Sequence, residues 1–113
     1  PAYQNGLAAY EPWATAVERG ETKFLRYYAG HYYGARCYAR DFLRSIAKPS
    51  RSLERAAEAY AEVADHLKVV WENASASGAL ASAKRDVVVA AIRAAGAAER
   101  CAVACLKGRL RSH

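Results

Sequence analysis

Apolar residues recur every three or four positions along four stretches of the chain, which is the spacing of one face of an α-helix. Gly20, Pro49 and the small polar segment 73–78 separate the stretches, and Ser50 or Ser52 can cap the third. The pattern predicts helices at about 6–19, 21–47, 51–74 and 80–110. Because almost no strand-like alternation is present, we expect an all-α protein. Its architecture would be an antiparallel helical bundle of three long helices plus a shorter N-terminal helix, in one domain covering residues 1–113.

The second and third predicted helices are amphipathic. On a helical wheel, the third places its apolar face opposite an acidic one. The second is expected to turn its aromatic and aliphatic side chains toward the core: Phe24, Leu25, Tyr28, Tyr32, Ala35, Ala39, Phe42, Leu43 and Ile46. Its basic side chains fall on the outer face: Arg26, Arg36, Arg40, Arg44 and Lys48.

The fourth predicted helix carries two adjacent apolar faces. One contains Leu80, Val87, Ala90, Ala91, Ala94, Ala98, Cys101 and Cys105, and the other contains Val88, Ile92, Leu106 and Leu110. A helix that is apolar on two sides must be covered on two sides. The second face therefore needs either the N-terminal helix or another chain, and we expect it to serve as an interface for a partner domain or for self-association.

The stretch RYYAGHYYGARCYARDF, residues 26–42, combines five tyrosines with one histidine and one cysteine. An aromatic stripe at helical spacing is typical of a packed core. If a gap remains between the helices, an aromatic pocket for a small organic ligand would be lined by Tyr28, His31, Tyr32, Tyr38 and Trp71. A mixed face among the arginines, with Tyr33, Cys37 and Arg40, indicates a protein contact surface.

The formal net charge of +6 is compatible with nucleic acid binding. A basic stripe from Arg36 to Lys48, continued by Arg51 and Arg55, provides the surface for this alternative. The neighbouring helix carries an acidic stripe, and no helix-turn-helix pattern is present, so the sequence disfavours nucleic acid as the partner.

Catalytic and metal-binding patterns are mostly missing. The sequence has no Glu-x-x-His pairs, Gly-rich phosphate loop or nucleophile elbow, and nearly all eleven carboxylates are expected to face outward. Cys101 and Cys105 could hold a soft metal with Cys37 or His31 as a third ligand, although on an apolar face they are more typical of core cysteines. We expect no enzyme activity, no cofactor and no metal.

No apolar run approaches the roughly 18 residues of a membrane span, and no charged-then-apolar leader occurs in the sequence. These features favour a cytoplasmic protein without a membrane partner.

Four segments, GLAAYEPWATAVERG, YYGARCYARDFLRSIA, LERAAEAYAEVADHLKVVWE and AAIRAAGAAERCAVACL, cover most of the chain. In this order they resemble the helical module of bacterial proteins whose N-terminal domain is papain-like, related to double-glycine peptidases and the butirosin acyltransferase. Pro12 and the Cys101/Cys105 pair depart from that pattern. The resemblance implies an accessory helical domain that packs on a partner domain or shapes a substrate site. It carries over no catalytic residue, since the nucleophilic cysteine belongs to the papain-like half.

Overall fold

The fold was analysed in a computed structural model, which describes residues 7–48, 50–75 and 77–111, with side chains as far as residue 108. The described residues form four helices and no strand: α2 (Tyr10–Glu18), α3 (Leu25–Ile46), α4 (Arg51–Asn73) and α5 (Ser82–Arg111). The predicted all-α helical bundle, with three long helices and a shorter N-terminal one, is confirmed.

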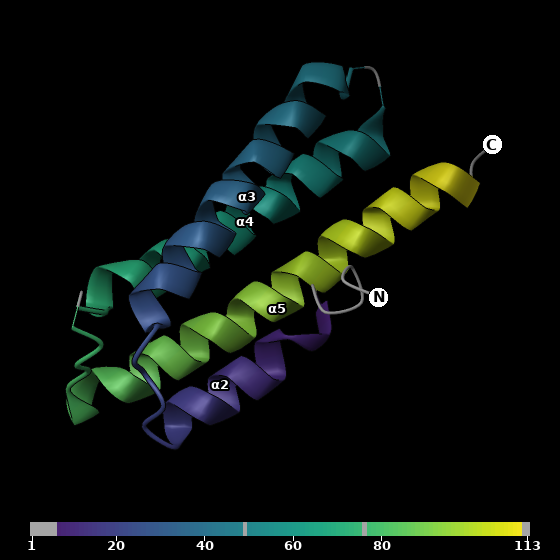
Figure 1. Cartoon of the computed structure of the whole chain (residues 1–113). Helices are drawn as coiled ribbons and strands as arrows, with labels where there is room; N and C mark the ends of the chain where they lie inside the picture. The colour runs from purple at the N-terminus through teal and green to yellow at the C-terminus, as the bar shows by residue number, and fades with distance from the viewer. Residues whose placement is uncertain (1–6, 49, 76, 112–113) are drawn as a thin grey trace.

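The long helices run antiparallel from one to the next (Figure 1). α4 packs against both α3 and α5, and α2 packs against α5. The third helix of the sequence, α4, is therefore central, whereas α3 lies at the edge of the bundle (Figure 1). The core has contributions from every helix: Tyr10, Ala14, Val17, Leu25, Ala29, Val63, Leu67, Val70, Val88, Ile92 and Ala95.

Two loops meet at one end of the bundle, and local chemistry explains how the helices end there. Gly20 ends α2 with a φ of 87°, a left-handed conformation that favours glycine, and Gly78 has a φ of 83° in the loop before α5. The Thr22 hydroxyl donates a hydrogen bond of 2.5 Å to the Gly78 carbonyl. The α4–α5 loop is thereby attached to the α2–α3 loop. At the other end, the Ser50 side chain caps α4 by accepting from the Leu53 N–H at 3.3 Å.

The face that α3 buries differs from the predicted one. Its buried side chains are Leu25, Ala29 and Leu43, followed by Ala47 just after the helix. Much of the predicted inner face is instead exposed: Phe24, Tyr28, Ala35, Phe42 and Ile46. The apolar arc of α3 is wider than the one helix packed along it can cover. α3 is rotated about its axis relative to the prediction. As a result Arg36, which was predicted to face outward, is half-buried against Glu99.

The expected interface on α5 also needs correction. Val88 and Ile92 are fully buried within the chain, so they belong to its own core and present no surface to a partner. They lie in the core that α5 shares with α4 and with the N-terminal helix α2, whose Tyr10 ring packs over Gly96. Leu106 is half-buried against the cluster around Leu43. The fourth residue of that prediction, Leu110, has a side chain outside the described set.

The other apolar face of α5 is the one that reaches solvent, at Val87, Ala90 and Cys101. Within the described residues, no helix is both long enough and apolar enough to cross a lipid bilayer.

Candidate functional site

The five residues predicted to line one pocket are divided among several places. Tyr28 lines a hollow between α2 and the start of α3, whereas His31 and Trp71 border a shallow depression between α3 and α4. Tyr32 packs against the core beside α2. Tyr38 projects into solvent with 74% of its surface exposed. The fold therefore does not assemble the predicted single pocket.

The aromatic rings nevertheless form one continuous series between α2 and α3. Tyr32 has its ring centroid 6.3 Å from that of Tyr10 and 5.4 Å from that of Trp13. The series continues along α3 from Tyr32 through His31, Tyr27 and Tyr28 to Phe24, with centroid separations of 5.6–6.3 Å. These separations lie in the favourable range for aromatic pairs. Contacts between rings thus hold the N-terminal helix against α3.

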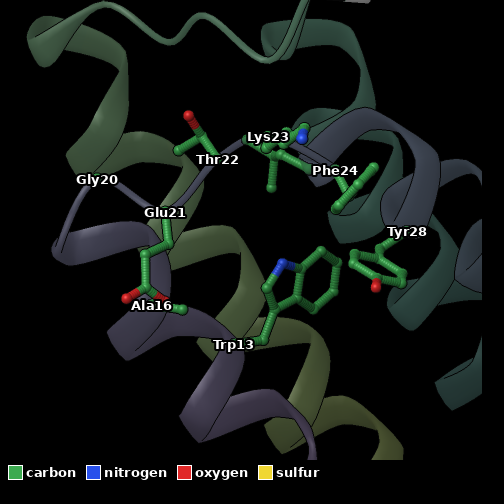
Figure 2. Close-up of a pocket in the computed structure, with 9 residues that line it drawn as sticks. Trp13, Ala16, Gly20, Glu21, Thr22, Lys23, Phe24 and Tyr28 are labelled. Atoms are coloured by element: carbon green, nitrogen blue, oxygen red, sulfur yellow. The ribbon is translucent and has the colours of Figure 1, made fainter.

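A hollow of about 430 Å³ lies at the end of this series, where the α2–α3 loop passes over α2. Figure 2 shows the rings of Trp13, Phe24 and Tyr28 around the same space. The carboxylate of Glu21 and the side chain of Lys23 also line it. The Lys23 ammonium lies 5.3 Å from the Phe24 ring centroid, within the range of a cation–π interaction. We refer to this site as the α2–α3 hollow.

A second hollow of about 430 Å³ lies beside Trp71, lined by Gly30, Tyr33 and Lys68. The Trp71 indole rests on α3 where Gly30 has no side chain, because a Cβ there would lie 3.2 Å from the indole Cδ1 and Nε1 atoms. The Arg26 guanidinium covers the indole at 4.3 Å from the ring centroid. Because the Arg26 guanidinium already occupies one face of the Trp71 ring, we interpret this indole mainly as a contact that packs α3 on α4.

A row of exposed apolar side chains runs along α3 from its N-cap Phe24. The sequence analysis assigned Phe24, Phe42 and Ile46 to the core and Tyr28 and Tyr38 to the ligand pocket. Its members are exposed by 46–74%: Phe24, Tyr27, Tyr28, Tyr38, Phe42 and Ile46. We call this surface the aromatic row. The exposed His31 and Ala35 lie between its two halves. The signal that could have revealed it is the width of the apolar arc of α3, which exceeds what one packed neighbour covers.

The predicted contact face of Tyr33, Cys37 and Arg40 is half-buried and is separate from the aromatic row. Arg40 forms an ion pair of 2.9 Å with Asp41. A hydrogen bond with Cys37 raises the pKa of the Tyr33 hydroxyl above its ordinary value. Arg40 and Cys37 therefore interact with neighbouring side chains on α3, whereas Tyr33 also packs against the core and borders the hollow beside Trp71.

A buried polar network joins α2, α3 and α5. The Tyr10 hydroxyl donates to Glu99 Oε1 at 2.6 Å. The Arg36 guanidinium makes a two-pronged contact with the same carboxylate, from Nε to Oε1 at 2.8 Å and from Nη2 to Oε2 at 3.1 Å. Glu99 is only 6% exposed. Its carboxylate is therefore an exception to the expectation that nearly all eleven carboxylates face outward. Tyr10 belongs to α2 and Arg36 to α3, so the network fixes how these two helices sit on α5.

The pH dependence of stability should report this network. Burial, together with the hydrogen bond to Glu99, raises the pKa of the Tyr10 hydroxyl above its ordinary value of about 10. A raised pKa means that the stabilisation is complete below pH 10 and is lost as the pH rises, because only the unfolded chain then ionises. We expect the free energy of unfolding to fall by about 1.4 kcal/mol per pH unit above pH 10. The measurement is urea unfolding at several pH values for the wild type and for Tyr10→Phe, which should lose this part of the slope. Equal slopes for both proteins would contradict the expectation.

The structure also bears on the alternative functions. Arg36 forms an ion pair with Glu99 and so does not contribute to the basic stripe considered for nucleic acid binding. Arg40 of the same stripe is paired with Asp41, which offsets its charge. The three cysteines are free thiols, with Cys101 exposed and the other two half-buried. Among the described residues, no three His, Cys, Asp or Glu side chains come together in a group that could hold a metal ion.

Compared with models of known protein families, with curated proteins and with solved structures, the chain gives no significant match. The resemblance to the helical module of papain-like bacterial proteins therefore stays a prediction.

Proposed function

We propose that this chain is a non-enzymatic helical binding module that docks on a partner protein through the aromatic row of α3. The observation that carries the proposal is the exposure of the six row residues, each by 46–74%, on one helix at the edge of the bundle. A contiguous apolar patch of this kind typically marks an interaction site on a small protein. Tyrosine and phenylalanine are also among the residues enriched in protein interfaces.

The size of the aromatic row suits a protein partner. Aromatic side chains bury about 150–250 Å² each, so at the observed exposures the row offers on the order of 600 Å². A standard protein interface buries about 800 Å² on each partner. The row, with its polar margin, thus approaches the area of one side of a stable complex.

The spacing and charge of the row indicate which kind of partner surface it fits. Tyr38, Phe42 and Ile46 follow one another at intervals of four residues. Side chains at this spacing form a ridge of the kind that fits into the groove of another helix. α3 contains four arginines and a single acid, Asp41, and the whole chain has a formal net charge of +6, which favours an acidic partner. We therefore assign the row to an amphipathic helix of another protein, with an apolar face and acidic edges.

The test uses two synthetic amphipathic helices of about 20 residues, one with glutamates along the edges of its apolar face and one with lysines. The wild-type chain should bind the acidic-edged peptide at least about tenfold more tightly than the lysine-edged one. The double variant Tyr38→Ser/Phe42→Ser should lose at least about tenfold in affinity for the acidic-edged peptide, measured by fluorescence anisotropy. Val87→Ser is the matched control, because Val87 is about as exposed as Phe42 but lies on α5.

Three results would overturn this proposal. The first is equal affinity for the two peptides, or no effect of the double variant. The second is a concentration-dependent dimer in sedimentation that the double variant abolishes, which would make a second copy the occupant. The third is binding to anionic lipid vesicles but to neither peptide, which would make the row a membrane-contact surface.

A further inference from the structure

The α2–α3 hollow has the chemistry of a site for an organic cation, and we infer that it binds a quaternary ammonium group. The hollow shares Phe24 and Tyr28 with the aromatic row, but this inference concerns a small ligand inside the hollow and does not depend on the proposed protein docking. Trp13 contributes from α2, while Phe24 and Tyr28 contribute from the start of α3, so that rings from two elements surround one space of about 430 Å³ (Figure 2). Aromatic faces arranged in this way attract methylated ammonium groups through the negative potential of their π systems.

The site is already engaged with a cation from its own chain. The Lys23 ammonium sits 5.3 Å from the Phe24 ring centroid. Lys23 is exposed, so its ammonium can withdraw into water when another cation enters. The geometry at Phe24 therefore places a positive charge where the inferred ligand would bind, and Lys23 acts as its competitor.

A carboxylate completes the site. Glu21 lines the hollow, and within the described part of the chain its carboxylate has no ion-pair or hydrogen-bond partner. Its negative charge would balance that of an entering ammonium group. Aromatic rings together with one carboxylate distinguish a cation site from a purely apolar one, which would accept a neutral molecule of the same shape equally well.

Trp13 provides a direct way to measure binding. The chain has two tryptophans, so the variant Trp71→Phe leaves Trp13 as the only indole fluorophore. In this background we expect choline to change Trp13 fluorescence saturably. The neutral isostere 3,3-dimethylbutanol should bind at least about tenfold more weakly, because it lacks the charge. A peptide containing trimethyllysine forms a second arm, which distinguishes a free small molecule from a modified protein as the source of the ammonium group.

Substitutions at the two exposed charged residues give opposite expectations and leave the packed rings in place. Glu21→Gln should weaken choline binding by about three- to fivefold, the effect of losing one solvent-exposed charge pair. Lys23→Met should strengthen it, since the competing ammonium is removed. The double variant Tyr38→Ser/Phe42→Ser should bind choline unchanged, so that failure of the docking proposal and failure of this one can be told apart.

The inference is overturned if neither choline nor the peptide produces a saturable response. It is equally overturned if the neutral isostere binds as well as choline, or if Lys23→Met weakens binding rather than strengthening it.

Discussion

Replacing Glu99 with alanine is expected to lower the free energy of unfolding by about 3–4 kcal/mol. The substitution leaves the Arg36 guanidinium without its two-pronged partner and the Tyr10 hydroxyl without its acceptor, both in largely water-excluded positions. Removing one member of a buried ion pair costs far more than the pair contributes, because the remaining charge stays desolvated. Urea unfolding monitored by circular dichroism measures the difference.

Two further variants make this expectation specific. The double variant Arg36→Met/Glu99→Leu removes both charges and fills the space with apolar atoms, so it should be less destabilising than Glu99→Ala. Glu11→Gln breaks one contact of the exposed Arg93, which also pairs with Glu18 across α2 and α5. It should change stability little, since water solvates both partners once they separate. If Glu99→Ala has no greater effect than Glu11→Gln, the network does not hold the helices together.

The second large effect is expected at Gly78. A Cβ added there would lie 2.9 Å from both the Cα and the carbonyl oxygen of Lys23, and these are backbone atoms that cannot move aside locally. The left-handed conformation of Gly78 adds a further cost of about 1–2 kcal/mol for any residue with a Cβ. We expect Gly78→Ala to destabilise the fold by about 3–4 kcal/mol, combining this cost with that of overlap.

Gly20→Ala is the matched control for this prediction. Gly20 has nearly the same φ, 87°, but an added Cβ would meet no atom within 4 Å. This variant should therefore lose only about 1–2 kcal/mol for the conformation itself. Thermal and urea unfolding of the two variants separate the conformational cost from the cost of overlap between the loops. Equal losses would show that the α4–α5 loop does not depend on close packing against the α2–α3 loop.

Periodicity and local chemistry were sufficient to predict the helices and most of their limits. The third helix was expected at about 51–74 and forms at Arg51–Asn73, with Ser50 as its cap. The second was expected to begin at about 21, yet α3 begins at Leu25. Residues 20–24 instead form the loop that contacts Gly78, a constraint from a part of the chain more than fifty residues away.

The candidate sites could be predicted only in part. The aromatic character of α3 was evident from its composition, and Tyr28 does line a hollow. The pattern could not show that Glu21 would line this hollow, or that Tyr32, Tyr38 and Trp71 would lie elsewhere. A helical wheel describes the apolar width of a helix but does not specify which part of that width a neighbour covers.

The sequence by itself determined the helical class, the four segments and the amphipathic character of each, because these depend on interactions between residues close together in the chain. Only the tertiary structure decided that α2 covers Gly96, that Arg36 turns inward to Glu99, and that Phe42 and Ile46 turn outward. These outcomes depend on contacts between residues that are distant in sequence. They follow from the competition among four helices for a limited area of shared core, which local periodicity does not describe.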